Sequence, residues 1–304
     1  MSKMKKQMKN VKIGAHPICW CNDDMLDLGD EYSFEDIVDQ AQEAGYVGIE
    51  LGRKFPKDPA VMKSELEKRG LKLTSGWCDT MFACKELRDE YFDMFKEKAK
   101  FLKECGCEVV VAAEGTGSNC WDPREYRDKA GVQKLNDEEW DLFTSGLNAA
   151  GEFCDSIGLQ LVYHVHTGTC CETYEETKRL CDNTDPDKVK LLADTGHLYC
   201  CDVDLEKFFR DFASRIAYVH LKNVREIVLD VVKDYKLDFN SAVKCGLFTV
   251  PGDGGIDYRP IMEILADNDY EGWMMVEAEQ YLPSPKTIVF MKMARDYIKE
   301  VTGL

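Results

Sequence analysis

Short apolar segments alternate with longer amphipathic segments along this chain of 304 residues. A short apolar segment bounded by turn residues predicts a buried strand, and the amphipathic segments predict helices. Eight strands are expected: Lys12–Ile18, Val47–Leu51, Lys72–Gly76, Glu108–Ala113, Leu159–His164, Val189–Asp194, Ile216–Leu221 and Trp273–Val276. Strands that alternate with helices predict an α/β fold with a parallel sheet, and eight of them favour a closed (β/α)₈ barrel.

The helices between these strands share a recognisable beginning and end. Segment Ser33–Ala44 starts with a serine, carries apolar residues at helical spacing and is followed by Gly45. Serine is a favoured first residue of a helix and glycine a favoured last one. The same logic predicts helices Asp58–Arg69, Leu87–Cys105 and Asp137–Ile157, each followed by glycine. The repeated pattern supports one architecture along the whole chain.

Residues 1–304 are therefore expected to form one barrel domain, since α/β barrels commonly have about 250 residues. Residues 1–10 are predicted to be a short N-terminal tail. The spacing lengthens after the seventh strand, and residues 223–255 are predicted to hold one or two short extra helices. An inserted segment at this position is expected to act as a lid or substrate loop.

Charge and composition exclude several classes of protein. Lys and Arg total 39 against 56 Asp and Glu, so the formal net charge is −17, which disfavours binding to nucleic acid or an anionic membrane. No apolar stretch is long enough for a signal peptide or a membrane span, so a cytoplasmic location is expected. The 14 cysteines lack paired CxxC spacing and are expected to be reduced and mostly buried.

All five histidines lie at or just beyond the carboxyl end of a predicted strand, at positions 16, 164, 166, 197 and 220. A (β/α)₈ barrel builds its active site at this end, so the fold itself brings distant histidines together. One such histidine alone is more often a hydrogen-bonded polar residue with no further role. Four successive strand ends with His, Asp and Glu are hard to explain in that way.

A metal site is the simplest explanation of these strand ends. His164 and His166 are two residues apart on a strand and so face the same side. Asp194 ends the sixth strand, His220 the seventh and Glu277 the eighth. Buried carboxylates are costly without a cation, and His with carboxylate suits Mn, Co, Fe or Zn.

Other residues near strand ends are candidates for substrate contacts or proton transfer. Glu50, Glu114 and Lys222 follow apolar segments directly, and Glu279 shares its face of the strand with Glu277. A surface position without a role is the alternative for each. Trp20 and Trp77 are candidates for stacking on a substrate ring, and an aromatic cap on the core is the alternative for both.

The chain resembles the xylose-isomerase-like barrels and, among them, the myo-inosose-2 dehydratase family. The resemblance covers nearly the whole chain and rests on these motifs: WCNDD at 20–24, ELGRKFP at 50–56, YHVHTGT at 163–169, DTGHL at 194–198, HLKNVR at 220–225, FTVPGDGGID at 248–257 and VEAEQ at 276–280. The dehydratases usually have YHHH where this chain has YHVH. Strand alternation turns the exchanged residue, Val165, away from the histidine cluster.

The resemblance implies a ligand set. In the wider superfamily Glu, Asp, His and Glu hold the metal, and the last three correspond to Asp194, His220 and Glu277. His164 stands in place of the first glutamate, with His166 as the alternative ligand. Family membership implies Mn or Co, with Zn, Fe and Mg as alternatives, and chains that pair or form tetramers.

The resemblance also implies a reaction, the dehydration of 2-keto-myo-inositol, a small polyhydroxylated cyclic ketone, to a trihydroxycyclohexane-1,2-dione. Glu114, His166 and His197 are the candidates for general acid and base, and Arg225 and Glu279 join the candidate substrate contacts. The alternatives are a keto-sugar isomerase or epimerase, a lyase of keto-sugars or keto-glycosides, and a sugar-binding barrel without a metal. The intact Asp194, His220 and Glu277 argue against the last.

Overall fold

The structure is a computed structural model that describes residues 4–123, 133–279 and 287–304. The first three residues of the predicted tail and Gln280 of the VEAEQ motif lie outside the described residues. In the described ranges, no helix has both the length and the apolar character needed to cross a membrane.

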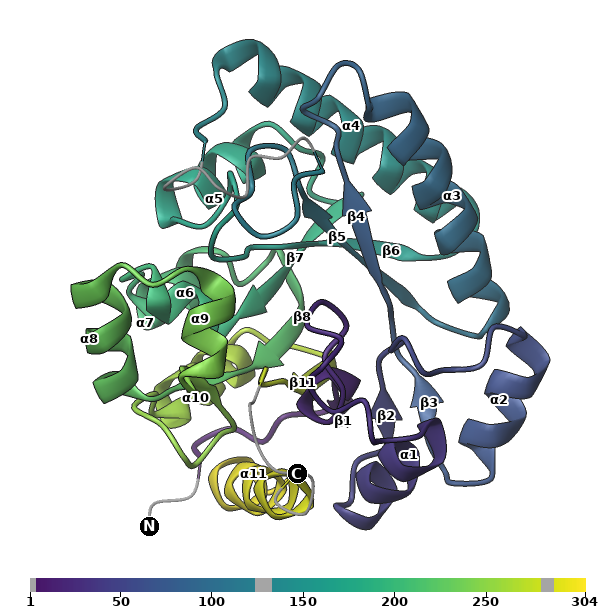
Figure 1. Ribbon diagram of the computed structural model, residues 1–304, viewed down its shortest axis with the longest axis vertical. Helices are drawn as coiled ribbons and strands as arrows, with labels where there is room; N and C mark the ends of the chain where they lie inside the picture. The colour runs from purple at the N-terminus through teal and green to yellow at the C-terminus, as the bar shows by residue number, and fades with distance from the viewer. Residues whose placement is uncertain (1–3, 124–132, 280–286) are drawn as a thin grey trace.

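A curled parallel sheet forms the centre of the molecule, and helices surround it (Figure 1). Its strands are β1 (Val11–Ala15), β2 (Gly48–Ile49), β3 (Lys72–Leu73), β4 (Trp77–Thr80), β5 (Val109–Glu114), β6 (Gln160–His164), β7 (Val189–Asp194), β8 (Ile216–Leu221) and β11 (Gly272–Val276). They pair in the order β3-β2-β1-β11-β8-β7-β6-β5-β4. The predicted (β/α)₈ barrel is confirmed, and the first and last strands, β1 and β11, are neighbours in it.

The predicted third strand, Lys72–Gly76, contains only the short strand β3, and a further strand of the same barrel position, β4, begins at Trp77, beyond the predicted end. β3 pairs with β2, and β4 pairs with β5, so the two ends of the sheet belong to one run of the chain. The residues between them continue the pairing on both sides, because Ser75 O accepts from Leu51 N at 3.0 Å and Gly76 O accepts from Val111 N at 3.1 Å. The barrel therefore closes through a single bent strand.

Nine helices of the described chain follow barrel strands or flank them: α1 (Phe34–Glu43), α2 (Pro59–Glu67), α3 (Arg88–Glu104), α4 (Asp137–Ser156), α5 (Tyr174–Asp182), α6 (Thr195–Cys200), α7 (Leu205–Asp211), α10 (Tyr258–Asp267) and α11 (Thr287–Thr302). Ser33 begins α1 with a reciprocal pair of hydrogen bonds to Asp36. Gly45 ends it with a φ of 88°, in the left-handed region that glycine adopts without strain.

The segment after β8 contains two helices and a short antiparallel pair of strands: β9 (Asn223–Val224), α8 (Glu226–Tyr235), α9 (Phe239–Lys244) and β10 (Phe248–Thr249). The side chain of Arg225 holds this segment together. Its guanidinium donates to Gly246 O and Phe248 O at 2.8 and 3.1 Å and to Asp253 Oδ2 at 2.8 Å.

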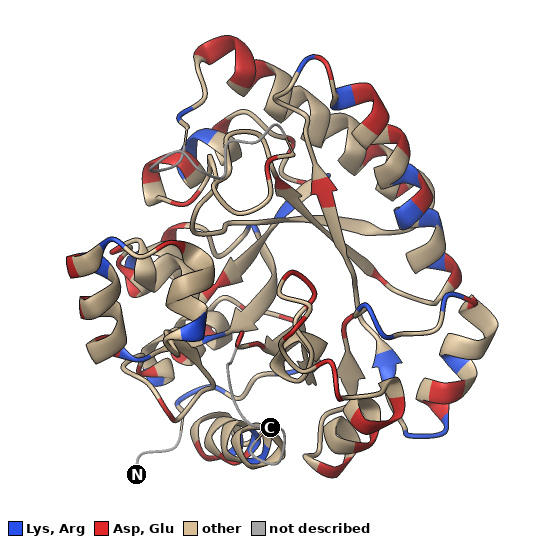
Figure 2. Ribbon diagram, viewed as in Figure 1, with Lys and Arg blue, Asp and Glu red and all other residues tan. Residues whose placement is uncertain are grey.

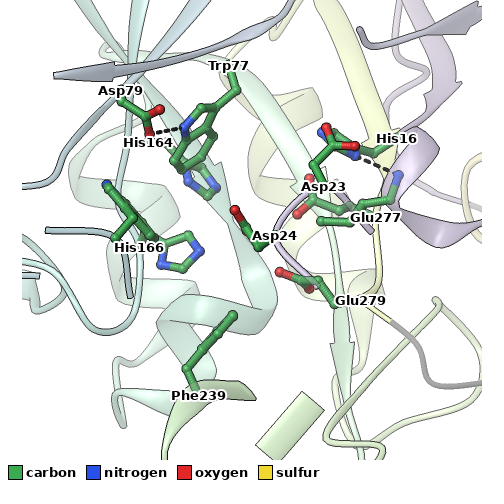
Figure 3. A pocket seen from close by; sticks show the side chains of 12 residues that line it. His16, Asp23, Asp24, Trp77, Asp79, His164, His166, Phe239, Glu277 and Glu279 are labelled. Atoms are coloured by element: carbon green, nitrogen blue, oxygen red, sulfur yellow. Dashed lines mark hydrogen bonds between the residues drawn. The ribbon is translucent and has the colours of Figure 1, made fainter. Parts of the chain in front are cut away.

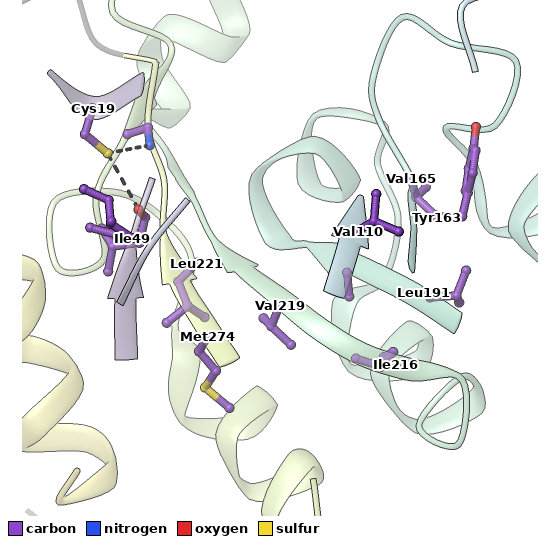
Figure 4. Packing of buried hydrophobic residues seen from close by; sticks show 14 of the residues in the cluster. Cys19, Ile49, Val110, Tyr163, Val165, Leu191, Ile216, Val219, Leu221 and Met274 are labelled. Carbon is purple, nitrogen blue, oxygen red and sulfur yellow. Dashed lines mark hydrogen bonds between the residues drawn. The ribbon is translucent and has the colours of Figure 1, made fainter. Parts of the chain in front are cut away.

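Apolar side chains pack on both sides of the barrel wall. The interior cluster consists of Val109, Val111, Val162, Leu192, Tyr218, Trp273 and Met275. The larger cluster includes residues of the opposite strand face, such as Val219, Leu221 and Met274, and fills the space toward the helices (Figure 4). Residues two apart on a strand face the same side, so the interior cluster identifies the inward positions of β5, β6, β7, β8 and β11.

Charged side chains lie mainly on the surrounding helices, whereas most of each barrel strand carries none (Figure 2). The exceptions at the carboxyl ends of strands are buried: Glu50, Glu114, Asp194, Lys222 and Glu277. Buried charge is expensive unless it is compensated, so these few positions need a specific explanation.

Candidate metal centre and active site

Four side chains converge at the carboxyl end of the barrel from consecutive strands. His164 follows Val162 inward on β6, Asp194 follows Leu192 on β7, His220 follows Tyr218 on β8, and Glu277 follows Met275 beyond β11. His164 Nε2 lies 3.6 Å and His220 Nδ1 lies 3.5 Å from Asp194 Oδ2. Glu277 Oε2 lies 2.5 Å from His220 Nδ1.

None of these four ligand atoms has a hydrogen-bond partner within the described chain, although all are buried. The short contact between His220 and Glu277 does not have the angles of a hydrogen bond. Atoms that share a transition-metal ion are about 3 to 3.5 Å apart, given metal–ligand distances near 2.1 Å. The distances of 3.5 and 3.6 Å to Asp194 Oδ2 are close to this range, and the contact between His220 and Glu277 is shorter. Two imidazole nitrogens and two carboxylate oxygens are ligand types that suit a divalent transition-metal ion.

The remaining atoms of the same side chains are held in place. Glu50 Oε1 lies 2.7 Å from His220 Nε2, so this nitrogen carries the proton and Nδ1 is the one that faces the centre. Asp194 Oδ1 accepts from the backbone of Gly196 and His197 at the start of α6, which leaves Oδ2 for the centre. Glu50 therefore orients the proposed ligand His220 through this hydrogen bond. The sequence predicts instead that Glu50 contacts the substrate.

Electrostatics keeps this cluster in a state suited to a cation. Burial lowers the pKa of His164, which favours the neutral ring that a metal requires. Burial opposes the charge of Asp194 as well, but Lys222 and the nearby imidazoles outweigh it and hold its pKa well below the usual value. Burial would also lower the pKa of His220, but Glu277 and Glu50 raise it well above normal, so an ion must displace a proton there.

A cavity of about 100 Å³ opens beside this centre (Figure 3). Its lining residues are His16, Ile18, Asp23, Asp24, Trp77, Asp79, Trp121, His164, His166, Phe239, Glu277 and Glu279. In Figure 3 the rings of Trp77, His164 and His166 form one wall, and the carboxylates of Glu277 and Glu279 lie opposite. The cavity thus offers an aromatic face and an acidic face to a small polar ring.

The aromatic wall is fixed by its own contacts. Trp77 Nε1 donates to Asp79 Oδ1 at 2.7 Å, two residues along the same face of β4. The indole then meets the rings of His164, His166 and Trp121 edge to face, with centroids 5.3–6.0 Å apart. Asp79 thereby sets the orientation of Trp77 against a predicted metal ligand.

His166 presents one nitrogen toward the cavity. Its Nδ1 lies 2.5 Å from the carbonyl oxygen of Thr167, which can only accept, so Nδ1 carries the proton and Nε2 has the free electron pair. Burial lowers the pKa of His166 well below normal. The residue is a neutral imidazole that can accept a proton.

His197 and Lys222 lie beneath His166 and do not line the cavity. The rings of His166 and His197 have centroids 3.6 Å apart, and Lys222 Nζ donates to His197 Nε2 at 2.7 Å. Lys222 Nζ also lies 2.8 Å from both Glu277 Oε1 and Glu279 Oε2. Burial would lower the pKa of Lys222, but Asp194 and the two glutamates raise it well above normal.

Three residues that the sequence predicts for the site, Glu114, Trp20 and Arg225, lie away from both the cavity lining and the proposed metal centre. Glu114 follows Ala112 on the outward face of β5, where its carboxylate accepts from Thr80 and Thr116 side chains and from the backbone of Phe82 and Ala83. Burial raises the pKa of Glu114, and these hydrogen bonds offset only part of the increase. The carboxylate of Glu114 is fully hydrogen-bonded and lies outside the cavity. This corrects the expectation that Glu114 acts as a general acid or base.

Trp20 and Arg225 also do not line the cavity. Trp20 is buried in the core, and its Nε1 donates to Gln40 Oε1 of α1 at 2.9 Å. This is the aromatic cap that the sequence left as the alternative. Arg225 is engaged within the inserted segment, as described above, so its guanidinium faces away from the cavity lining.

The lining contains residues that the sequence analysis did not select: His16, Asp23, Asp24, Asp79, Trp121 and Phe239. His16 follows β1 directly and is one of the five strand-end histidines, but the sequence gives it no specific role. Asp23 and Asp24 belong to the WCNDD motif, which carries the resemblance. Trp121 and Phe239 reach the cavity from loops and from α9, where periodicity gives no direction for a side chain.

Comparisons with known proteins agree with this geometry. Residues 38–294 match the family described as "Xylose isomerase-like TIM barrel". The chain is 41% identical over 295 residues to an inosose dehydratase of Geobacillus kaustophilus, with 97% of this chain and 96% of the relative covered. An inosose dehydratase of Clostridium botulinum is also 41% identical, with 97% and 98% covered.

Solved structures share the fold at low sequence identity. The IOLI protein with a binding zinc atom has a TM-score of 0.72 at 14% identity, covering 96% of this chain and 98% of its own. The probable 3-DHS dehydratase AsbF from Bacillus anthracis has a TM-score of 0.69 at 16% identity, covering 96% and 99%. The near-complete matches at 41% identity show more than the fold: the chain belongs to the inosose dehydratase family of xylose isomerase-like TIM barrels.

Proposed function

We propose that this protein removes water from an inosose, 2-keto-myo-inositol, and yields a trihydroxycyclohexane-1,2-dione. The observation that carries the proposal is the 41% identity to inosose dehydratases over 97% of the chain. The reaction requires a base for the proton next to the ketone, stabilisation of negative charge on the ketone oxygen, and an acid for the departing hydroxyl. Each can be assigned to residues of the cavity.

His164, Asp194, His220 and Glu277 are the proposed ligands of a divalent ion. Their unpartnered nitrogen and oxygen atoms converge at the barrel end, and mixed imidazole and carboxylate ligands suit Mn or Co. When bound, such an ion supplies a Lewis acid that stabilises negative charge on an oxygen of the substrate by several kcal/mol. Two of the proposed ligands, His164 and Glu277, also line the cavity, so this charge would be available to a ring bound there.

His166 is the proposed general base. Its Nε2 electron pair is free because Nδ1 is bound to the carbonyl oxygen of Thr167, and the residue lines the cavity. Burial lowers the pKa of His166 and so keeps the ring neutral, which leaves the Nε2 electron pair unprotonated before the reaction. His197 packs on the ring of His166 and holds it, so His197 is proposed as a positioning residue.

Glu279 is the proposed acid for the departing hydroxyl. It lies across the cavity from His166, with their reactive atoms within 4.8 Å of each other, so one small ring can touch both. Burial raises the pKa of Glu279, and the charge of Lys222 reverses this only in part. The carboxyl group therefore keeps a proton more readily than an exposed glutamate does.

The walls of the cavity fit the faces of a cyclic polyol. The C–H face of the ring can lie against Trp77, and the hydroxyl groups can donate to Glu279 and to the Asp23–Asp24 pair. Recognition of this kind needs a ring that carries many hydroxyls, which distinguishes an inosose from an apolar ketone.

The test is to incubate the metal-stripped chain with 2-keto-myo-inositol, with and without Mn²⁺, and to follow the dione by its ultraviolet absorbance. We expect product only when the metal is present. A stereoisomer or an aldose–ketose product without the dione would instead establish an isomerase or epimerase on the same barrel. No turnover of this substrate with the metal bound would contradict the proposal.

A further inference from the structure

The amino group of Lys222 is enclosed completely and surrounded by acceptors. The side chain has no exposed surface, and its Nζ lies 2.7 Å from His197 Nε2 and 2.8 Å from Glu277 Oε1 and Glu279 Oε2. Asp194 Oδ2 lies 3.4 Å away, and the ring of Phe248 covers Nζ at 4.8 Å from its centroid. This is the coordination environment of a small cation, filled by an ammonium group.

The same acceptors form groups that could themselves hold a metal. His166, His197 and Glu279 offer ligand atoms within 4.8 Å of one another, as do Asp194, His197 and Glu277. Glu277 and Asp194 also belong to the proposed metal centre, so the two positions share residues.

The backbone makes room for the lysine. A methyl group added to Gly196 would lie 2.6 Å from Cγ of Lys222, so the stem of the lysine occupies the space that a side chain on α6 would need. Asp194 and Glu277 can neutralise a divalent ion by themselves, and the ammonium group also lies 2.8 Å from the third carboxyl group, that of Glu279. The position and the charge of Lys222 both match a missing second cation.

We propose that Lys222 occupies the place of a second metal ion and keeps the centre mononuclear. This inference rests on the metal centre of the proposed function but not on its substrate. Removal of the side chain should open a second site, formed by His197 and Glu279 with Glu277 bridging the two ions. Lys222 is thus a positioning residue that limits the number of bound ions to one. Its amino group also contacts both Glu277 and Glu279 and so holds the two side chains together.

The experiment measures metal per chain by mass spectrometry of the elements, after the full-length protein is saturated with Mn²⁺ and passed through a desalting column. We expect one ion in the unaltered chain and two in Lys222→Ala. The double variant Lys222→Ala/Glu279→Gln should return to one ion, because the second site loses its carboxylate. Lys190→Ala, on the partly exposed face of β7, is the matched control and should hold one ion.

One ion in folded Lys222→Ala, or two in the unaltered chain, would overturn the inference. If Lys222→Ala does not fold by circular dichroism, electron paramagnetic resonance of the unaltered chain decides. Isolated Mn²⁺ ions at saturation support the inference, and an exchange-coupled pair overturns it. A chain that binds no ion would remove the metal centre as well, whereas a chain that binds one ion but makes no dione contradicts only the proposed function.

Discussion

The carboxyl end of β5 carries a buried carboxylate, and so do the carboxyl ends of β7 and β11. The two regions differ in the hydrogen bonds that these carboxylates accept. Glu114 at the end of β5 faces the helices, and both its oxygens accept hydrogen bonds from neighbouring loops. Asp194 and Glu277 face the barrel axis, and each leaves one oxygen without a hydrogen-bond donor. Burial alone therefore does not distinguish the two regions, whereas the hydrogen bonding of the buried carboxylate oxygens does.

This contrast predicts the largest effect for Asp194→Ala. The variant should lose its metal, and turnover should fall by about 10³-fold or more, since a bound ion contributes several kcal/mol. Metal content and product formation measure this directly. Asp187→Ala, at the exposed start of the same strand region, is the control and should keep both. Full metal occupancy in folded Asp194→Ala would refute the assignment of this ligand.

His166→Ala should separate chemistry from metal binding. His166 lies beside the metal centre but is not one of its proposed ligands, so the variant should retain most of its metal. Loss of a general base lowers turnover by roughly 10²- to 10⁴-fold. A variant that also loses the ion would show that His166 is a ligand.

Glu114→Ala tests the other side of the comparison. The variant leaves the backbone N–H groups of Phe82, Ala83 and Thr116 and the hydroxyl group of Thr116 without this acceptor, at a cost of about 2–4 kcal/mol in the free energy of unfolding. Urea denaturation measures the loss, and metal content should stay at the level of the unaltered chain. If the metal disappears while the barrel remains folded, the two regions are not independent.

The smallest effect is expected for Asp79→Ala, which removes the acceptor that orients Trp77. One lost hydrogen bond of this kind corresponds to about 1 kcal/mol, or roughly fivefold in kcat/KM. Asp79→Asn keeps an oxygen acceptor and should recover most of the activity. Equal loss in both variants would mean that the charge of Asp79, and not the orientation of Trp77, is what matters.

The sequence predicts the barrel well because apolar periodicity determines which segments become strands. It also predicts the meeting of His164, Asp194, His220 and Glu277, since parallel strands bring their carboxyl ends together. The prediction for Glu114 is wrong because Glu114 lies at the end of a strand but on the outward face of that strand. Val109 and Val111 point inward, so Glu114, three residues after Val111, points outward.

Other differences depend on contacts that no local pattern contains. The bend in the third strand follows from closure of the barrel, since Lys72–Leu73 and Trp77–Thr80 pair with different neighbours. Likewise, the predicted first strand stops at Ala15, where Pro17 begins a short 3₁₀ turn because proline has no N–H to donate. The guanidinium of Arg225 donates to carbonyl oxygens of residues more than twenty positions further along the chain, Gly246 and Phe248.

The pairing of β1 with β11 encloses the longest stretch of chain between any two neighbouring strands of the barrel. Every other neighbouring pair in the barrel joins strands that are close in sequence order, and the bent third strand joins its ends through the chain itself. Only the register from Val11 to Gly272 and from Ala15 to Val276 brings the two distant parts of the chain together. Because loop-closure entropy grows only slowly with the length of chain enclosed, about 0.6 kcal/mol per doubling, this pairing between the two ends of the barrel costs only moderately more than a pairing of consecutive strands.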